Sequence, residues 1–241
     1  VISHIVSAIH PQPADHLVEI GPGQGALTDS LVSSGAQLDV IELDRNLVPG
    51  LLAAFSVHRN FKLHSADALT FDFSSLVAAN EQLRVVGNLP YNISTPLIFK
   101  LLENAGIIRD MHFMLQLEVV QRLAARPGSK HWGRLGIMTQ YHCEVEHLFD
   151  VPPEAFDPPP KVQSAIVRLS PWREPKWPGC KEETLRKVVQ AAFAQRRKTL
   201  RNNLKGLIDV TRLESLGIDP GARAETLELQ QFIEMANSTD D

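Results

Sequence analysis

The sequence predicts an α/β protein, with a Rossmann-like sheet of seven strands followed by a small, all-helical C-terminal domain. Short apolar runs alternate with longer segments of helical period over residues 17–169. This alternation is typical of a mostly parallel sheet that helices cover on both faces. After the stretch 171–178, which is rich in proline and tryptophan, the pattern is helical only. We therefore expect a sheet domain over residues 1–177 and a helical domain over residues 178–241.

The individual elements follow from the same alternation. A proline-rich loop, rather than a helix, joins the last two predicted strands, which predicts one antiparallel strand at the edge of the sheet. Strands are expected at residues 17–20, 38–42, 61–65, 84–87, 111–116, 145–151 and 164–169. Helices are expected at 26–33, 47–55, 71–79, 95–104, 119–125 and 135–141, and after the linker at 182–207, 210–216 and 222–236.

The composition excludes several classes of protein. Hydrophobic residues make up 44% of the 241 residues, which is enough for a buried core, and no apolar run approaches the roughly 20 residues of a membrane span. The two cysteines cannot form a disulfide framework, and the histidines show no zinc-ligand spacing. We therefore expect a cytoplasmic protein without metal or membrane. The chain starts at Val1 without an initiator methionine or a signal peptide, so a preceding segment is expected to be missing.

Basic residues are concentrated near the C-terminus. The whole chain has 24 lysines and arginines against 28 aspartates and glutamates, but residues 161–206 hold 12 basic and 3 acidic residues. Such a window is typical of a surface that binds a polyanion. It is equally typical of a solvated basic helix, and charge alone does not decide between the two.

A glycine-rich turn follows the first predicted strand, in the run Glu19-Ile20-Gly21-Pro22-Gly23-Gln24-Gly25. Glycines between a strand and a helix let the backbone approach a ligand closely. Glu42 ends the second strand about 20 residues later, where an acid can accept hydrogen bonds from both hydroxyls of a ribose. The joint placement predicts a site for a nucleoside-containing cofactor, bound by Gly21, Gly23, Gly25 and Glu42.

The residues within the turn indicate which cofactor binds. A pyrophosphate needs open amides and no neighbouring acid, whereas Glu19 precedes this turn and Pro22 removes one amide donor. An acid at that place suits a cation such as an ammonium or a sulfonium, and the Glu-x-Gly-x-Gly-x-Gly turn resembles that of S-adenosylmethionine-dependent methyltransferases. Asp67 follows the third strand, where such folds bind the adenine amino group. Its alternative role is a helix cap before Leu69.

The fourth predicted strand runs into Asn88-Leu89-Pro90-Tyr91, which resembles the Asn/Asp-Pro-Pro-Tyr motif of amino-group methyltransferases. The exocyclic amine of adenine is a poor nucleophile because its lone pair is delocalised into the ring. Two acceptors on its N–H bonds favour rehybridisation, and we expect the Asn88 side chain and the Leu89 carbonyl to supply them. Pro90 would hold that carbonyl in place, and Tyr91 would stack on the base. Asn88 is also expected to contact the cofactor. The alternative is a turn that only caps the next helix.

Phe156 is a second aromatic candidate, on the proline-rich loop before the last predicted strand. Its ring is placed to close over the other face of a flipped base. Its alternative role is to fill an apolar space beneath the loop.

These motifs resemble those of the ribosomal RNA adenine N6,N6-dimethyltransferase family over essentially the whole chain. The resemblance implies a class I methyltransferase sheet, S-adenosylmethionine as the methyl donor, and two adjacent adenosines near the 3′ end of small-subunit rRNA, in an immature 30S particle, as substrate. We expect a monomer. Family members begin with a basic arm and a Gly-Gln-Asn-Phe type segment that touches the cofactor, and this chain starts after it. The similarity is carried by Gly87–Pro96, Leu117–Arg122, Gly133–Leu135 and Ala192–Leu200, and by Val151–Leu169, which resembles the bacterial KsgA branch in particular.

The basic residues are candidates for binding the RNA backbone. Arg197, Arg201 and Lys205 recur every four residues and would form a stripe on one helix, which suits a row of phosphates. A second group surrounds the loop at residues 127–129. The full set is Arg122, Arg126, Lys130, Arg134, Arg196, Arg197, Lys198, Arg201 and Lys205.

Two other classes of function share part of this pattern. A large-subunit rRNA methyltransferase or a DNA adenine methyltransferase would have most of the motifs, and the block Phe156–Leu169 argues against both. A non-catalytic RNA-binding or assembly factor would have the same fold. The presence of Glu42, Asp67 and Asn88–Tyr91 argues for a catalyst instead.

Overall fold

The computed structural model describes residues 1–78, 81–90, 92–156 and 158–239. It divides into two compact units: Val1–Val120 with Glu144–Arg173, and Gln121–Cys143 with Glu174–Asp241. The second unit thus contains the helical region expected from residue 178 onwards, together with residues 121–143, which the sequence analysis assigns to the sheet domain.

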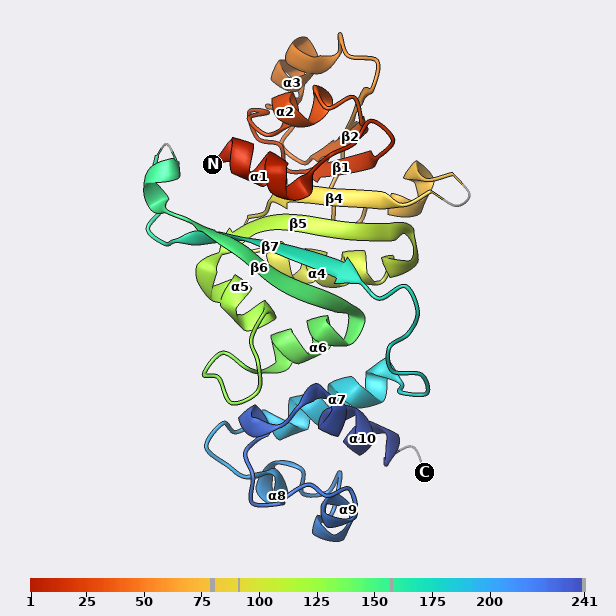
Figure 1. The fold of residues 1–241 in the computed structure, drawn as a ribbon, viewed down its shortest axis with the longest axis vertical. Coiled ribbons are helices and arrows are strands. Elements are labelled where there is room, and N and C mark those ends of the chain that lie inside the picture. Colours follow the sequence, from red (N-terminus) through yellow and green to blue (C-terminus); the bar gives the residue numbers. More distant parts are fainter. Residues whose placement is uncertain (79–80, 91, 157, 240–241) are drawn as a thin grey trace. The chain divides into compact units, whose positions relative to one another are not determined.

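The first unit contains a seven-stranded sheet in the order β3-β2-β1-β4-β5-β7-β6 (Figure 1). Neighbouring strands from β3 to β5 are parallel, and β7 runs antiparallel to β5. The seven predicted strands are confirmed, but the edge prediction is wrong. The antiparallel strand β7 lies between β5 and β6, and β6 is the strand at the edge of the sheet. The strands are β1 (His16–Ile20), β2 (Gln37–Glu42), β3 (Phe61–Ser65), β4 (Leu83–Asn88), β5 (Ile108–Gln116), β6 (Cys143–Val151) and β7 (Ser164–Pro171).

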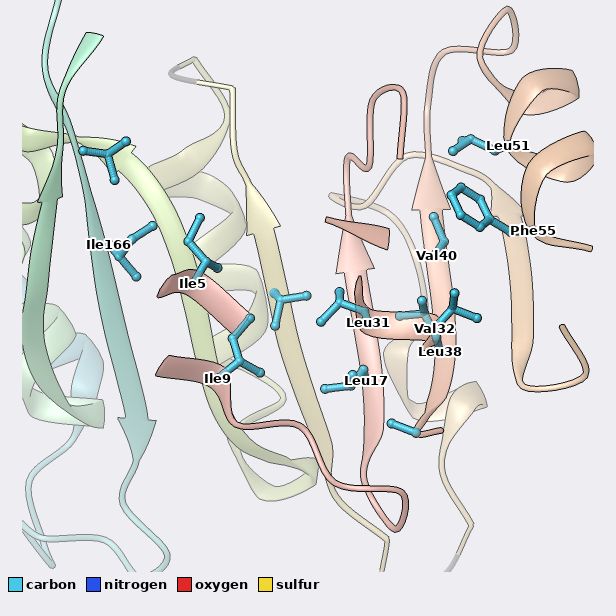
Figure 2. Close-up of a cluster of buried hydrophobic side chains, with 13 residues drawn as sticks. Ile5, Ile9, Leu17, Leu31, Val32, Leu38, Val40, Leu51, Phe55 and Ile166 are labelled. Carbon is cyan, nitrogen blue, oxygen red and sulfur yellow. The ribbon is translucent and has the colours of Figure 1, made fainter. Parts of the chain in front are cut away.

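Helices flank this sheet, and α1 (Ile2–Ile9) is one that the sequence analysis did not predict. Its Ile5 and Ile9 belong to one buried cluster with Leu17 of β1 and Ile166 of β7 (Figure 2). Within the predicted helix at 71–79, the described residues 71–78 form only a 3-10 turn, Phe73–Leu76. The other helices and turns are α2 (Thr28–Val32), α3 (Val48–Phe55), α4 (Ser94–Leu102), α5 (Leu117–Leu123), and 3-10 turns at Ala105–Ile107 and Pro153–Ala155.

A buried arginine fixes the end of α1 against the sheet. Arg84 of β4 donates to the Ile9 carbonyl at 2.6 Å, to Asp15 at 2.7 Å and to Asp110 of β5 at 3.0 Å. These bonds join the end of the helix, the residue that precedes β1, and the middle of the sheet. They hold α1 over the sheet face on which Glu19 lies.

The second unit is helical, but its longest predicted helix is wrong. The expected helix at 182–207 ends at Ala192, because the Asn203 side chain donates to the carbonyls of Ala192 at 2.6 Å and Gln195 at 3.1 Å. Arg197 therefore lies in a turn and the predicted basic stripe does not exist on one helix. The expected helix at 222–236 is also divided. The elements are α6 (Arg134–His142), α7 (Glu182–Ala192), α8 (Leu200–Asn203), α9 (Val210–Ser215), a 3-10 turn (Ala224–Thr226) and α10 (Leu229–Asn237).

None of the helices in the described part of the chain combines the length and the apolar character that a membrane crossing requires.

Candidate active site

The carboxyl ends of four adjacent parallel strands carry the polar groups singled out in the sequence. In the order β3-β2-β1-β4, these are Asp67 after β3, Glu42 at the end of β2, the glycine turn after β1 and Asn88 at the end of β4. Strand order reverses between β1 and β4 in this sheet. Ligands of such sheets bind outside the carboxyl ends of the strands at the point of reversal, so this edge is the candidate site.

Two cavities open at this edge. The glycine-turn cavity, of about 430 Å³, is lined by Glu19, by the turn from Gly21 to Gln24, and by residues of α1, β4, β5 and β7. The loop cavity, of about 620 Å³, is lined by Asn88, Leu89, Pro90, Asn92, Phe156, Pro158, Pro160 and Ser164. Asn88 and Phe156 line both cavities. Groups bound in the two cavities would therefore meet at these two side chains.

The glycines of the turn have different roles. Gly23 has a φ of +59°, and a Cβ there would meet nothing within 4 Å, so its backbone borders open space in the glycine-turn cavity. Gly25 has a φ of +86°, and a Cβ there would come within 2.5 Å of the Phe55 ring. Gly25 does not line the cavity. The packing of α3 against the turn explains this glycine.

Glu19 is an acid buried in the wall of the glycine-turn cavity. Its exposed fraction is 2%, and the Thr28 hydroxyl donates a hydrogen bond to its Oε2 at 2.6 Å. Burial raises the pKa of Glu19 to about 7, against the lowering effect of the Thr28 bond, and the charge of Glu42 raises it further. No lysine or arginine among the described residues lines this cavity. A cationic ligand would supply the missing counter-charge.

The raised pKa of Glu19 predicts a measurable effect on stability. The pKa of Glu19 is about 7 in the folded protein and about 4.5 in the unfolded chain. Its protonated form therefore stabilises the fold fully below about pH 4.5, and this contribution is lost as the pH rises to about 7. A shift of this size corresponds to about 3 kcal/mol. Because glutamine does not titrate, Glu19→Gln should gain stability relative to the wild type between about pH 5 and about pH 8.

Urea unfolding of the ligand-free wild type and of Glu19→Gln, each at about pH 5 and about pH 8, measures this difference in stability. Other titrating groups are common to both proteins and cancel in the comparison. A stability difference that is the same at both pH values would contradict the assignment.

Glu42 and Asp67 lie beyond the glycine-turn cavity, at the neighbouring strand ends. Glu42 is buried, and its Oε1 accepts the Asp44 amide at 2.8 Å. Its Oε2 accepts no hydrogen bond from the described residues. Asp67 accepts the Leu69 amide at 2.9 Å, so the cap-type bond of the alternative role exists, although a turn and not a helix follows. A ligand extending from the glycine turn along the edge would pass Glu42 and then Asp67.

The loop after β4 leads directly into a helix and also faces the cavities. The Pro90 carbonyl accepts the amides of Ile93 and Ser94, each at 3.2 Å, at the start of α4. Leu89 is 1% exposed and its amide donates to the Met114 carbonyl at 3.2 Å, so its backbone is fixed against β5. Asn88 is exposed at the junction of the cavities. Tyr91, the predicted stacking residue, lies outside the described residues.

Phe156 fills apolar space beneath the loop, which is its alternative role, and it also borders both cavities. It is partly buried and packs against the core cluster beneath the loop. The same side chain lines both cavities opposite the β4 loop. Its amide donates to the Pro153 carbonyl at 3.1 Å, which ends a 3-10 turn directly before the ring.

Comparison with known proteins places the chain in a family. The family model described as Ribosomal RNA adenine dimethylase matches residues 1–241. The chain is 61% identical over 237 residues to Ribosomal RNA small subunit methyltransferase A of Pseudomonas aeruginosa, which is 98% of this chain and 88% of that protein. The chain belongs to the ribosomal RNA adenine dimethylase family.

Solved structures agree with this dimethylase fold. A dimethyladenosine transferase from Plasmodium falciparum superposes with a TM-score of 0.83 at 24% identity, covering 97% of this chain and 93% of that one. The 23S rRNA methyltransferase ErmE superposes with a TM-score of 0.78 at 28% identity, covering 100% and 97%. The Rossmann-like class I methyltransferase fold expected from the sequence is therefore confirmed.

The basic residues singled out in the sequence all lie in the second unit of this dimethylase chain, and all nine are exposed. The structure brings the two predicted groups together. Arg196 donates to the Lys130 carbonyl at 3.0 Å and pairs with Glu225 at 3.2 Å, and the Gly128 amide donates to the Glu225 carbonyl at 2.7 Å. The loop at 126–134 and the turn at 194–199 are therefore neighbours.

The sequence did not indicate the wall of the candidate site that comes from α1 and β5. Ile2 and Ile5 of α1 and His112 and Met114 of β5 line the glycine-turn cavity. The spacing of the nine histidines gives no sign of a zinc site, and it does not single out His112, which is 3% exposed. Its signal was a histidine inside the apolar run 111–115, where only buried positions are expected.

Proposed function

We propose that this member of the family transfers methyl groups from S-adenosylmethionine to the N6 atoms of two adjacent adenosines near the 3′ end of small-subunit rRNA, giving N6,N6-dimethyladenosine. The substrate is an immature 30S particle, and the enzyme acts as a cytoplasmic monomer. The observation that carries the proposal is the position of Asn88 and Phe156 in the walls of both cavities. The 61% identity to a small-subunit methyltransferase, against 28% to the 23S methyltransferase ErmE, favours the small subunit.

The residues of the glycine-turn cavity and the adjoining strand ends fit S-adenosylmethionine. Glu19 is a buried acid that lacks a basic partner in the cavity, which suits the charged amino-acid end. Gly23 leaves its backbone open to the cavity. Glu42 Oε2 is the acceptor that we propose for the ribose hydroxyls, and Asp67 is the acceptor that we propose for the adenine amino group. When bound, this cofactor supplies an already activated methyl group.

The residues at the junction act on the target amine. Asn88 Oδ1 accepts one N–H of adenine N6, and the Leu89 carbonyl accepts the other. Both bonds favour a localised lone pair on the nitrogen. The Leu89 amide donates to the Met114 carbonyl, which fixes this residue against β5. Phe156 bounds the base on the opposite side of the loop cavity. Because alignment supplies much of the rate, no covalent bond to the enzyme is needed. The amine gives up one proton for each methyl group that it gains.

A labelling experiment separates this function from its alternatives. Tritiated S-adenosylmethionine is offered with the protein to immature 30S particles, to 50S particles and to duplex DNA. We expect label on the 30S rRNA alone. Label on 50S particles or on DNA would favour the other enzyme classes. Tight binding to 30S particles without label would favour a non-catalytic assembly factor.

We propose that the exposed basic residues of the second unit bind the RNA backbone. Arg197, Arg201 and Lys205 do not share a helix, but each is exposed. Of the nine basic residues singled out in the sequence, only Arg196 forms an ion pair with another described residue. Lysines and arginines that are free of acidic partners neutralise phosphates and release counterions on binding.

Replacing Arg197, Arg201 and Lys205 together by alanine should weaken binding to 30S particles at low salt and leave cofactor affinity unchanged. The slope of log affinity against log salt should fall by roughly 0.7–0.9 for each phosphate contact removed. The control replaces Arg186 and Lys187, whose charges are paired with Glu182 at 2.5 Å and Glu183 at 2.8 Å, and should change the slope less. Wild-type affinity of the triple variant at low salt would show that these residues form only a solvated face.

A further inference from the structure

His112 of β5 is a buried histidine whose hydrogen-bonding capacity is unused. It is 3% exposed and lines the glycine-turn cavity. Neither Nδ1 nor Nε2 has a hydrogen-bond partner among the described residues. Buried polar side-chain atoms nearly always have a partner, and leaving one without costs free energy. The missing partner of His112 is therefore to be sought in the cavity.

The charged neighbours of His112 on its sheet face are already engaged with other residues. Asp110 Oδ1 lies 3.5 Å from His112 Nδ1, beyond good hydrogen-bond length, and both Asp110 oxygens accept from Arg84 Nε, at 3.0 and 3.2 Å. Arg168, directly opposite His112 on β7, donates to Glu146 at 2.6 Å. Among the described residues, His112 thus has only the 3.5 Å contact with Asp110, and its other neighbour is the cavity.

The strand register places His112 and Glu19 on either side of one apolar residue. Glu19 of β1 is opposite Val86 of β4, and Val86 is opposite His112 of β5. Residues opposite each other in a sheet share a face, and neighbouring strands lie about 4.8 Å apart, so the two backbones are separated by about 10 Å. An acid and an imidazole thus face the same cavity across Val86.

This arrangement matches a group that carries a cation and an anion on one carbon atom. Glu19 suits an ammonium, whereas a carboxylate needs hydrogen-bond donors. No lysine or arginine among the described residues lines the cavity, and of the two β5 side chains that do line it, His112 and Met114, only the imidazole can donate a hydrogen bond. We propose that His112 donates a hydrogen bond to the carboxylate of the amino-acid end of S-adenosylmethionine, while Glu19 binds its ammonium. This inference rests on the proposed cofactor.

A cycle of two proteins and two ligands tests this contact. The ligands are S-adenosylmethionine and decarboxylated S-adenosylmethionine, which keeps the ammonium and the sulfonium but lacks the carboxylate. The proteins are the wild type and His112→Phe, which keeps a ring and loses both nitrogens. Calorimetry gives the four dissociation constants without any need for turnover.

We expect the wild type to bind S-adenosylmethionine about 10-fold to 100-fold more tightly than the decarboxylated ligand, the range for one hydrogen bond to a charged group. In His112→Phe this preference should fall towards one, because only the affinity for S-adenosylmethionine drops. His112→Gln, whose amide nitrogen is a donor, should retain part of the preference. His147→Leu, which removes an exposed histidine of β6, is the control and should leave it unchanged.

The possible results separate this inference from the proposed cofactor. A wild type that binds neither ligand would overturn the cofactor, and the inference with it. A wild type that binds both, with a preference that survives in His112→Phe, would overturn the role of His112 and leave the cofactor in place. If His112→Phe does not fold, as judged by thermal unfolding, His112→Leu is measured in the same cycle and must lose the preference.

Discussion

Replacing Asn88 by alanine should remove most methyl transfer and leave cofactor affinity nearly intact. Asn88 is exposed where the glycine-turn cavity meets the loop cavity, so its amide oxygen can accept from the reacting amine. Removal of one preorganised hydrogen-bonding group from a reacting centre costs about 10²- to 10³-fold in rate. Single-turnover methylation of 30S particles measures the rate, and calorimetry measures the affinity for S-adenosylmethionine.

Asn92→Ala is the matched control for this experiment. Asn92 lines the loop cavity but not the glycine-turn cavity, so its loss should have a much smaller effect on the rate. Near-normal turnover of Asn88→Ala would remove Asn88 from the reaction. A loss of cofactor affinity as large as the loss of rate would make it a binding residue instead.

Replacing Glu42 by alanine should weaken S-adenosylmethionine binding by well over tenfold. Two hydrogen bonds from ribose hydroxyls to a carboxylate are each worth roughly 1.5–3 kcal/mol. Glu42 also accepts the Asp44 amide at 2.8 Å, and Glu42→Gln keeps an acceptor for that bond. Glu42→Gln therefore removes the carboxylate charge without removing the hydrogen bond to the Asp44 amide. Comparing it with Glu42→Ala shows how much of the lost affinity is due to the charge and how much to that bond.

Asp44→Ala removes the neighbouring exposed acid and should leave the affinity unchanged. Loss of the Glu42 charge should also lower the pKa of Glu19, because that charge is one cause of its rise. Unchanged affinity of Glu42→Ala by calorimetry would exclude Glu42 from the site.

The sheet could be predicted from the sequence because each strand is recognisable from a short stretch, as an apolar run between helical segments. The order of the strands is not local. The chain order of β6 and β7 does not reveal that β7 inserts between β5 and β6. Nor does local periodicity reveal that Asn203 ends α7 by capping the Ala192 carbonyl. That bond depends on how the chain turns back, so the helical pattern was extended too far.

The same distinction holds for the candidate site. Glu19, Glu42 and Asn88 lie at strand ends. Each belongs to a short motif that can be recognised in the sequence, so each could be predicted as a site residue. The opposite wall comes from α1, from β5 and from Phe156, which are far apart in the chain. His112 belongs to that wall, and its importance follows only from the burial and the empty hydrogen-bonding positions that the structure shows.

Mass spectrometry of the nucleosides from 30S rRNA shows whether the protein dimethylates adenosine. Unmethylated 30S particles are incubated with the protein and excess S-adenosylmethionine, and the modified residues are located in the rRNA. We expect N6,N6-dimethyladenosine at two adjacent positions near the 3′ end, because the loop cavity must accept the monomethylated amine as its next substrate. Monomethyladenosine as the only product, with enzyme and cofactor in excess, would contradict this expectation.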